Sequence, residues 1–193
     1  MDNAFHTCDG RAMAAKTHAH YEDAFKRYLG DHRVPFVTVQ QLVRPSDEIG
    51  RIKNFDLLVH APDGRHYIVD VKGKRFPSSA GSREIFWENW IHLDDLDGLV
   101  AWEEHFGPGY TGLLVFVYWL QADVSAPATL SLYECQGRQY LMVGITVSDF
   151  LDNCRRRSLR WQALDVPDKV FLNLIRPVDK LILNDPKARA SKQ

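Results

Sequence analysis

The sequence predicts an α/β protein in which a mixed β-sheet is flanked by helices, and three observations lead to this prediction. Amphipathic, helix-like segments alternate with β-branched apolar runs along the chain. The turn residues Pro62-Asp63-Gly64 separate two apolar runs, which is typical of a β-hairpin. The run "GLLVFVYWL" at 112–120 is apolar throughout, as in a strand that is buried on both faces.

The first half of the chain is expected to hold one helix and three strands. The helix is predicted over Thr17–Leu29, "THAHYEDAFKRYL", with Thr17 as its N-cap and Gly30 as its stop. The β-branched segment "PFVTVQQLV" at 35–43 is predicted to be a strand. The two strands of the hairpin follow within Phe55–Lys74.

The second half begins with an amphipathic helix at 93–106, in which Asp94 and Asp95 stand at the positive N-terminal end. The apolar strand at 112–120 follows. The remaining predicted elements are a hairpin at 130–135 and 139–146, a short helix at 148–154 capped by Ser148, and a short last strand, "KVFLNLI", at 169–175. The expected order is therefore helix, strand, strand pair, helix, strand, strand pair and helix.

Length and composition predict a single domain that spans 1–193. The chain has 193 residues, of which 45% are apolar and 25% charged, as is ordinary for a soluble protein with a hydrophobic core. The formal net charge of -1 excludes a uniformly basic nucleic-acid binder but allows a local basic patch. The expected subdivisions are a loose N-terminal arm at 1–11, a core at 17–120, C-terminal strands and a helix at 121–183 packed on that core, and a polar tail at 184–193.

The cysteines and the apolar runs indicate a cytoplasmic protein. Cys8, Cys135 and Cys154 are widely spaced and odd in number, which argues against a disulfide framework and a thiolate zinc site. A reducing compartment is then the default. The N-terminus lacks the apolar core of a signal peptide, and the longest apolar run, 113–120, is too short to span a membrane.

The predicted hairpin carries an unusual set of charged residues between apolar neighbours. Asp56 lies in the first run, and Asp70 and Lys72 lie in the second. Because side chains alternate along a strand, Asp70 and Lys72 share one face. In a tight hairpin Asp56 lies near the far end of the partner strand, on the same side as Asp70. Buried charges of this kind are costly unless they are paired or bind a ligand.

Such a pair of acids favours a divalent cation. Two carboxylates that are brought together repel each other and raise each other's pKa. A cation between Asp56 and Asp70 removes this conflict, and all-oxygen ligation suits Mg²⁺ or Mn²⁺. The ion can polarise a phosphate and lower the pKa of a bound water. Lys72 is then placed to position that water or to stabilise charge on the phosphate.

Asp56 and the tripeptide "DVK", Asp70-Val71-Lys72, resemble the metal-site signature of the PD-(D/E)xK nuclease superfamily, which has the restriction-endonuclease-like fold. In that signature an Asp at a strand end precedes an acid-x-Lys on the next strand. The αβββαβ core of the family is similar to the element order predicted over 17–120. One departure is that the proline usually found before the first Asp is absent, and "NFD" stands there instead.

The resemblance implies a role for each of these residues. Asp56, Asp70 and Glu22, an acid on the first helix, would be metal ligands, together with the carbonyl of Val71. Lys72 would be catalytic, and the cofactor would be Mg²⁺ or Mn²⁺. An alternative reading makes Asp70 and Lys72 a solvated edge face, Asp56 a hydrogen-bonded turn acid and Glu22 a solvated helix acid. The apolar neighbours of both strands argue against this alternative.

Two groups of basic residues are candidates for contact with a nucleic-acid backbone. Lys74 and Arg75 directly follow the motif. The densest basic cluster, which ends beside Trp161, consists of Arg155, Arg156, Arg157 and Arg160. It suggests phosphate contacts with stacking on the tryptophan. The same cluster is also what a helix C-terminus enriched in cations would look like.

The sequence therefore predicts a metal-dependent endonuclease that hydrolyses phosphodiester bonds of nucleic acid, with DNA favoured over RNA. No membrane partner is expected, and a homodimer is allowed. The main alternative is a catalytically silent domain of the same fold that binds nucleic acid or protein. A third is an unrelated α/β domain with structural acids. The segment "DDLDGLVAWEEHFG" also resembles the helix after the motif in archaeal Holliday-junction resolvases, a likeness of amphipathic pattern that gives little weight to junction cleavage.

Overall fold

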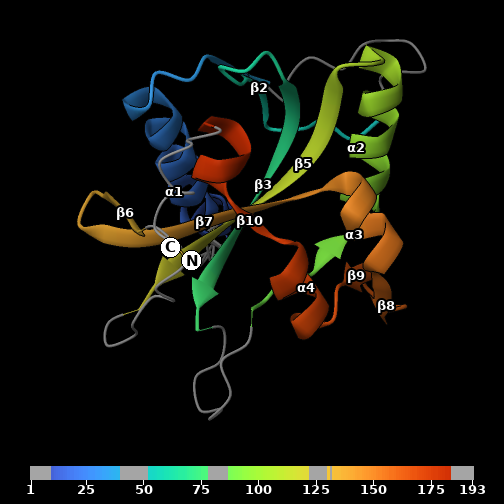
Figure 1. Ribbon diagram of the computed structural model, residues 1–193. Helices are drawn as coiled ribbons and strands as arrows, with labels where there is room; N and C mark the ends of the chain where they lie inside the picture. Colours follow the sequence, from blue (N-terminus) through green and yellow to red (C-terminus); the bar gives the residue numbers. More distant parts are fainter. Residues whose placement is uncertain (1–9, 40–51, 78–86, 122–129, 131, 184–193) are drawn as a thin grey trace, which may run out of the picture.

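A mixed β-sheet with helices on both of its faces forms the body of the protein, in a computed structural model (Figure 1). The structure describes residues 10–39, 52–77, 87–121, 130 and 132–183. The strand order in this sheet is β1-β2-β3-β5-β7-β10, and β6 pairs with β7 beside that path. Strands β4, β9 and β8 form a second, small sheet. The predicted fold class is confirmed.

The elements follow one another in an order that begins with the αβββαβ arrangement implied by the resemblance. A two-residue strand, β4, is inserted before the second helix. The elements are α1 (Gly10–Asp31), β1 (Phe36–Thr38), β2 (Leu57–His60), β3 (His66–Phe76), β4 (Ile91–His92), α2 (Leu93–Phe106), β5 (Tyr110–Leu120), β6 (Leu132–Cys135), β7 (Arg138–Thr146), α3 (Val147–Asn153), β8 (Arg155–Ser158), β9 (Ala163–Asp165), α4 (Asp168–Leu174), β10 (Arg176–Pro177) and the π-helix η2 (Asp179–Leu183).

The centre of the large sheet is built from its two longest strands. Strand β3 runs parallel to β5, from the pair His66 and Tyr110 to the pair Phe76 and Leu120. Strand β2 is much shorter and pairs with β3 in antiparallel register through the predicted hairpin, so that Leu57 stands opposite Val69. The side chains of β5 from residue 112 to 118 are all buried, as the apolar run predicts.

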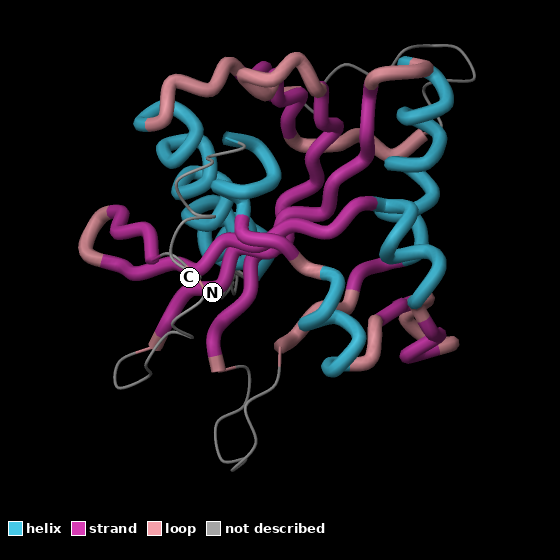
Figure 2. The backbone as a smooth tube through the Cα atoms, viewed as in Figure 1, coloured by secondary structure: helices cyan, strands magenta, loops and turns pink. Residues whose placement is uncertain are grey.

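The large sheet divides the hydrophobic core into two halves, and helices cover each of its faces (Figures 1 and 2). Helix α1 packs on one face, where Phe25 and Leu29 are fully buried and η2 adds Ile182. Helices α2, α3 and α4 cover the other face. Since β3 and β5 lie between the two halves, their side chains alternate between them.

Several predicted boundaries and one predicted element are wrong. Helix α1 begins at Gly10 rather than at Thr17, because the preceding segment "RAMAAK" is a good helix former and continues the helix. The cap of α3 is Thr146, whose hydroxyl accepts a hydrogen bond from Asp149 N at 3.1 Å, and not Ser148. Three of the predicted segments lie wholly or partly outside the described residues. They are most of the expected arm, in 1–9, part of the expected strand at 35–43, in 40–51, and the tail at 184–193.

The predicted strand at 169–175 is instead the helix α4. Short apolar runs are ambiguous between strand and helix, and here the buried Phe171 sits one turn before the buried Ile175. Beyond α3 the chain forms the hairpin of β8 and β9, and β9 pairs with β4. No helix within the described ranges has the length and hydropathy that crossing a bilayer requires.

Candidate metal-dependent hydrolytic site

The candidate site lies beside β3, at the point just before β2 where the pairing of the two segments ends. The last backbone hydrogen bond between these segments runs from Asp56 N to Val69 O, at 2.9 Å. Two residues further along β3, the backbone N–H of Val71 points toward the same edge. It donates a hydrogen bond to Oδ2 of Asp56, at 2.7 Å. In a strand the N–H and C=O of one residue point to the same side. The carbonyl of Val71 therefore faces this opened edge as well.

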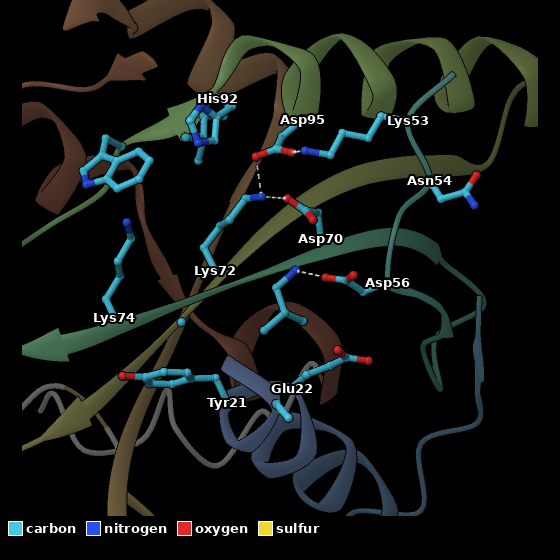
Figure 3. Close-up of a pocket in the computed structure, with 15 residues that line it drawn as sticks. Tyr21, Glu22, Lys53, Asn54, Asp56, Asp70, Lys72, Lys74, His92 and Asp95 are labelled. Carbon is cyan, nitrogen blue, oxygen red and sulfur yellow. Dashed lines mark hydrogen bonds and ion pairs between the residues drawn. The ribbon is translucent and has the colours of Figure 1, made fainter. Parts of the chain in front are cut away.

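A pocket of about 450 Å³ occupies this position. It is bounded by α1, the segment that leads into β2, the middle of β3 and the segment that enters α2 (Figure 3). Its lining residues are Ala19, Tyr21, Glu22, Lys53, Asn54, Asp56, Asp70, Val71, Lys72, Gly73, Lys74, Trp90, Ile91, His92 and Asp95. The structure thus brings the four side chains predicted from the sequence, Glu22, Asp56, Asp70 and Lys72, to one pocket.

Helix α1 reaches the pocket because Gly73 lets it approach β3 closely. A Cβ atom on Gly73 would lie 2.2 Å from Cδ2 of Tyr21, so only a glycine leaves room for that ring. The next residue of the helix, Glu22, faces the pocket from below Asp56 (Figure 3). Glu22 also pairs with Lys26 one turn along the helix, with 2.6 Å between Oε1 and Nζ.

Asp70 is the most strongly perturbed acid of the pocket. It is 8% exposed, and burial raises its pKa to about 7. The positive charge of Lys72 lowers the pKa, whereas the negative charges of Asp56 and Asp95 raise it. Although Lys72 Nζ lies 2.5 Å from Oδ2 of Asp70, this buried oxygen makes no hydrogen bond of suitable geometry with any described residue.

Asp56 shares this environment. Burial raises its pKa, and the charge of Glu22 raises it further. The Val71 N–H, which binds the charged carboxylate, lowers the pKa but does not cancel the shift. In both carboxylates, burial and repulsion by neighbouring acids outweigh the nearby positive charge. Each is therefore harder to ionise than an exposed Asp.

Asp95 lines the same pocket but is not among the site residues predicted from the sequence. It accepts a hydrogen bond from Lys72 Nζ, at 2.6 Å to Oδ2, and it also pairs through Oδ1 with Lys53 (Figure 3). Burial raises the pKa of Asp95, but the two lysines outweigh burial and the pKa lies below its ordinary value. One available signal was that Asp95 precedes Leu96 and Leu99 on the apolar stripe of its helix, where an acid needs a partner.

The donor set suits a hard divalent cation. The described residues contain no ready group of three or more His, Cys, Asp or Glu side chains spaced around one point. Mg²⁺, however, is usually bound by one or two carboxylates and keeps several waters. Asp70 offers a buried carboxylate whose Oδ2 has only Lys72 as a polar partner among the described residues, and Asp56 and the Val71 carbonyl face the same opening. These oxygens fit such an ion.

The predicted nucleic-acid residues divide into three places. Lys74 is 9% exposed, lies 3.3 Å from Glu88 Oε1 and sits over the ring of Trp90. Burial lowers its pKa despite the charge of Glu88. Arg75 is exposed at the end of β3, where it lies over the ring of Trp119. Lys74 thus belongs to the pocket wall, whereas Arg75 points away from the pocket, to the α1 face of the sheet.

The arginine cluster lies in the β8–β9 hairpin and not at a helix C-terminus, because α3 ends at Asn153. Arg155 bonds Asp165, at 3.0 Å from Nε to Oδ1, and Arg157 lies 3.7 Å from the same carboxylate. Arg160 sits over the ring of the exposed Trp161. This hairpin borders the pocket, since the carbonyl of Trp161 contacts the pocket residue His92 at 3.1 Å.

Comparisons with known proteins show a distant structural likeness. No model of a known protein family matches the sequence, and no curated protein matches it. Among solved structures, the chain is similar to Hjc, a Holliday junction resolvase from the archaeal hyperthermophile Archaeoglobus fulgidus. The two are 11% identical, the match covers 85% of this chain and 98% of that chain, and the TM-score is 0.49. The functional proposal below therefore depends on the pocket itself.

Proposed function

We propose that the protein is a Mg²⁺- or Mn²⁺-dependent nuclease that hydrolyses phosphodiester bonds of nucleic acid, with DNA favoured over RNA. The observation that carries the proposal is one pocket containing two carboxylates, the buried Asp70 and the half-buried Asp56, together with a half-buried lysine, Lys72. This combination matches the motif recognised in the sequence, and a solvated edge face would not bury it.

In this proposal Asp56, Asp70 and the Val71 carbonyl hold the ion, and Glu22 completes the ligand set or orients a water bound to the ion. The bound ion supplies Lewis-acid polarisation of a phosphate oxygen and a more acidic water. Lys72 is a cation and is no metal ligand, so it acts on the water or on charge that develops at the phosphate. Lys74, on the same face of β3 two residues further on, would have to leave Glu88 to reach a neighbouring phosphate.

Cleavage assays on supercoiled plasmid DNA and on end-labelled RNA and DNA oligonucleotides test the proposal. We expect cleavage with Mg²⁺ or Mn²⁺ and none with excess chelator. Lys72→Ala should lower the rate about a hundredfold or more, the scale of losing one group that stabilises the transition state. Lys169→Ala, an exposed lysine on α4, is the matched control and should keep the wild-type rate. Equal cleavage by Lys72→Ala and wild type would refute the proposed role of Lys72.

A second candidate is a catalytically silent domain of the same fold that binds nucleic acid. It is favoured by the ion pair between Lys72 and Asp70, which neutralises the acid without any metal. This candidate predicts binding of the same oligonucleotides in gel-shift assays without cleavage under any divalent cation. Cleavage that is lost in Asp70→Asn would exclude it.

A further inference from the structure

One buried acid of the pocket, Asp95, stands outside the recognised motif. It is 6% exposed and comes from the first turn of α2, on the other side of the pocket from Asp56 (Figure 3). Its two oxygens contact two different lysines. Oδ2 pairs with Lys72 of β3, and Oδ1 pairs with Lys53 of the segment that leads into β2. Asp95 thus ties together three segments that meet at the pocket.

Lys72 lies between two carboxylates and forms an ion pair with each of them. Its Nζ donates to Asp95 Oδ2 at 2.6 Å. The distance to Asp70 Oδ2 is similar, 2.5 Å, and this buried oxygen has no other polar partner within the described residues. The ammonium is therefore shared between Asp70 and Asp95, at nearly equal distances from the two carboxylates.

We propose that Asp95 is a positioning residue, which shares the ammonium of Lys72 with Asp70 and so weakens the ion pair that a divalent cation would have to displace from Asp70. This inference rests on the proposed function, because it concerns uptake of that ion. Without Asp95, Lys72 would have Asp70 as its only close acid. An entering cation would then have to displace the whole ion pair from a poorly solvated site, where charge pairs are strongest.

The surroundings of Asp95 suit such an anchor. The carboxylate stands in the first turn of α2, where the helix dipole favours negative charge. The backbone beside it is held closely, because a Cβ on Gly98 would lie 2.8 Å from the carbonyl oxygen of Lys53. Lys53 itself is half exposed and contacts Asp95 but not Asp70, so it offers a matched comparison with Lys72.

The test is a double-mutant cycle read out by Mn²⁺ affinity in titration calorimetry. Asp95→Asn should weaken Mn²⁺ binding about tenfold, which is within the usual range for coupled neighbours. In a Lys72→Met background, which has no competing ammonium, the same substitution should cost much less. Lys53→Met removes the other lysine on Asp95 and should not rescue Asp95→Asn.

The outcomes separate this inference from the proposed function. If the wild type binds no Mn²⁺, the proposed function and this role both fail. If it binds Mn²⁺ but Asp95→Asn costs the same with and without Lys72, Asp95 acts as a ligand or as a plain charge, and the positioning role alone is overturned. Should Asp95→Asn fail to fold by circular dichroism, Lys72→Met alone decides: tighter Mn²⁺ binding supports the inference, and unchanged or weaker binding overturns it.

Discussion

At the scale of single residues, the pocket holds acids and lysines in close contact, and burial strengthens the interactions between their charges. Among the described residues, Asp70 and Asp95 form ion pairs with two lysines, Lys53 and Lys72, in surroundings where charge is poorly solvated, while Asp56 accepts a hydrogen bond from the backbone of Val71. Burial, and after it the charge of neighbouring acids, raises the pKa of Asp56 and of Asp70, and a divalent cation would stabilise their charged forms. Two predictions follow from these interactions.

The first prediction concerns Asp70 and pH. Its pKa in the folded protein, about 7, lies above the ordinary value of 3.8, so between these values the folded state holds a proton that the unfolded state has lost. Stability contributed by this proton is present below about pH 4 and is lost as pH rises through about 7. In metal-free buffer at pH 8, Asp70→Asn should therefore be more stable than wild type, by on the order of 2 kcal/mol.

Urea denaturation at pH 4 and pH 8, with chelator present, checks this prediction. The advantage of Asp70→Asn should be largest at pH 8 and should shrink toward pH 4. Mn²⁺ affinity of the wild type should fall by about tenfold per pH unit below pH 7, because the ion must displace one proton. A stability difference that does not change with pH would contradict the raised pKa.

The second prediction separates two neighbouring acids of α1. Glu22 lines the pocket, whereas Asp23 is exposed, because successive residues of a helix are rotated by about 100°. Glu22→Gln should lower Mn²⁺ affinity or cleavage about tenfold, on the scale of losing an outer ligand. Asp23→Asn should leave both unchanged. If neither substitution matters, the site consists of Asp56, Asp70 and Lys72 without a helix acid.

The residues of the pocket differ in how readily the sequence reveals them. Asp56, Asp70 and Lys72 are visible because they interrupt apolar strands at fixed spacing, and a tight turn determines which positions meet. Asp95 is hidden because an acid in the first turn of a helix already has a local explanation, the helix dipole. Its partners, Lys53 and Lys72, are far from it in sequence, and only packing of α2 brings them together.

At the scale of elements, the close approach of α1 to β3 depends on one residue without a side chain. Gly73 follows Lys72 directly and carries the ring of Tyr21 against its backbone. Any Cβ at this position would push the helix, and with it Glu22, away from the edge of β3 beside Asp56. Glycine at Gly73 is therefore required for the geometry of the pocket as well as for packing.

The third prediction is that Gly73→Ala destabilises the protein by about 1–3 kcal/mol, as overpacking does, and also weakens Mn²⁺ binding. Thermal unfolding and calorimetry on the same samples measure both effects. Gly30→Ala, which meets no atom within 4 Å near the end of the same helix, is the control and should be neutral or stabilising. Wild-type stability in Gly73→Ala would mean that the Tyr21 ring can move away at little cost.

The elements that the sequence predicts well have strong local signals. The hairpin of β2 and β3 has its turn residues, β5 its continuous apolar run, and α2 its periodicity and flanking glycines. The strands β4, β8 and β9 have only two to four residues each. Their sequences, IH, RRRS and ALD, are too short or too polar to show the alternating pattern of a strand. They exist because they pair with one another, which is tertiary context that propensity cannot supply.

At the scale of the whole molecule, the C-terminal third brings a basic hairpin to the rim of the pocket. Two of its arginines, Arg155 and Arg157, share the carboxylate of Asp165. Arg156 is exposed and has no ion pair among the described residues. The charge available to a nucleic-acid backbone is therefore smaller than the run of arginines suggests.

The fourth prediction follows from this difference. Each phosphate contact contributes roughly -0.9 to the slope of log affinity against log salt on duplex DNA. Arg156→Ala should flatten the slope by about one contact, whereas Arg155→Ala should change it less, because its guanidinium is engaged by Asp165. Fluorescence anisotropy over a salt series, with chelator present to prevent cleavage, measures the slopes. Identical slopes for wild type and Arg156→Ala would remove the hairpin from the binding surface.

The central claim is that one divalent cation binds between Asp56 and Asp70 while Lys72 remains on Asp95. The most direct measurement is the anomalous difference density of a crystal grown with Mn²⁺. We predict a single peak within ligand distance of both carboxylates and of the Val71 carbonyl, with the hydrogen bond from Lys72 Nζ to Asp95 retained. Density that is empty at this position, in crystals whose Mn²⁺ concentration saturates any binding seen in solution, would contradict the account.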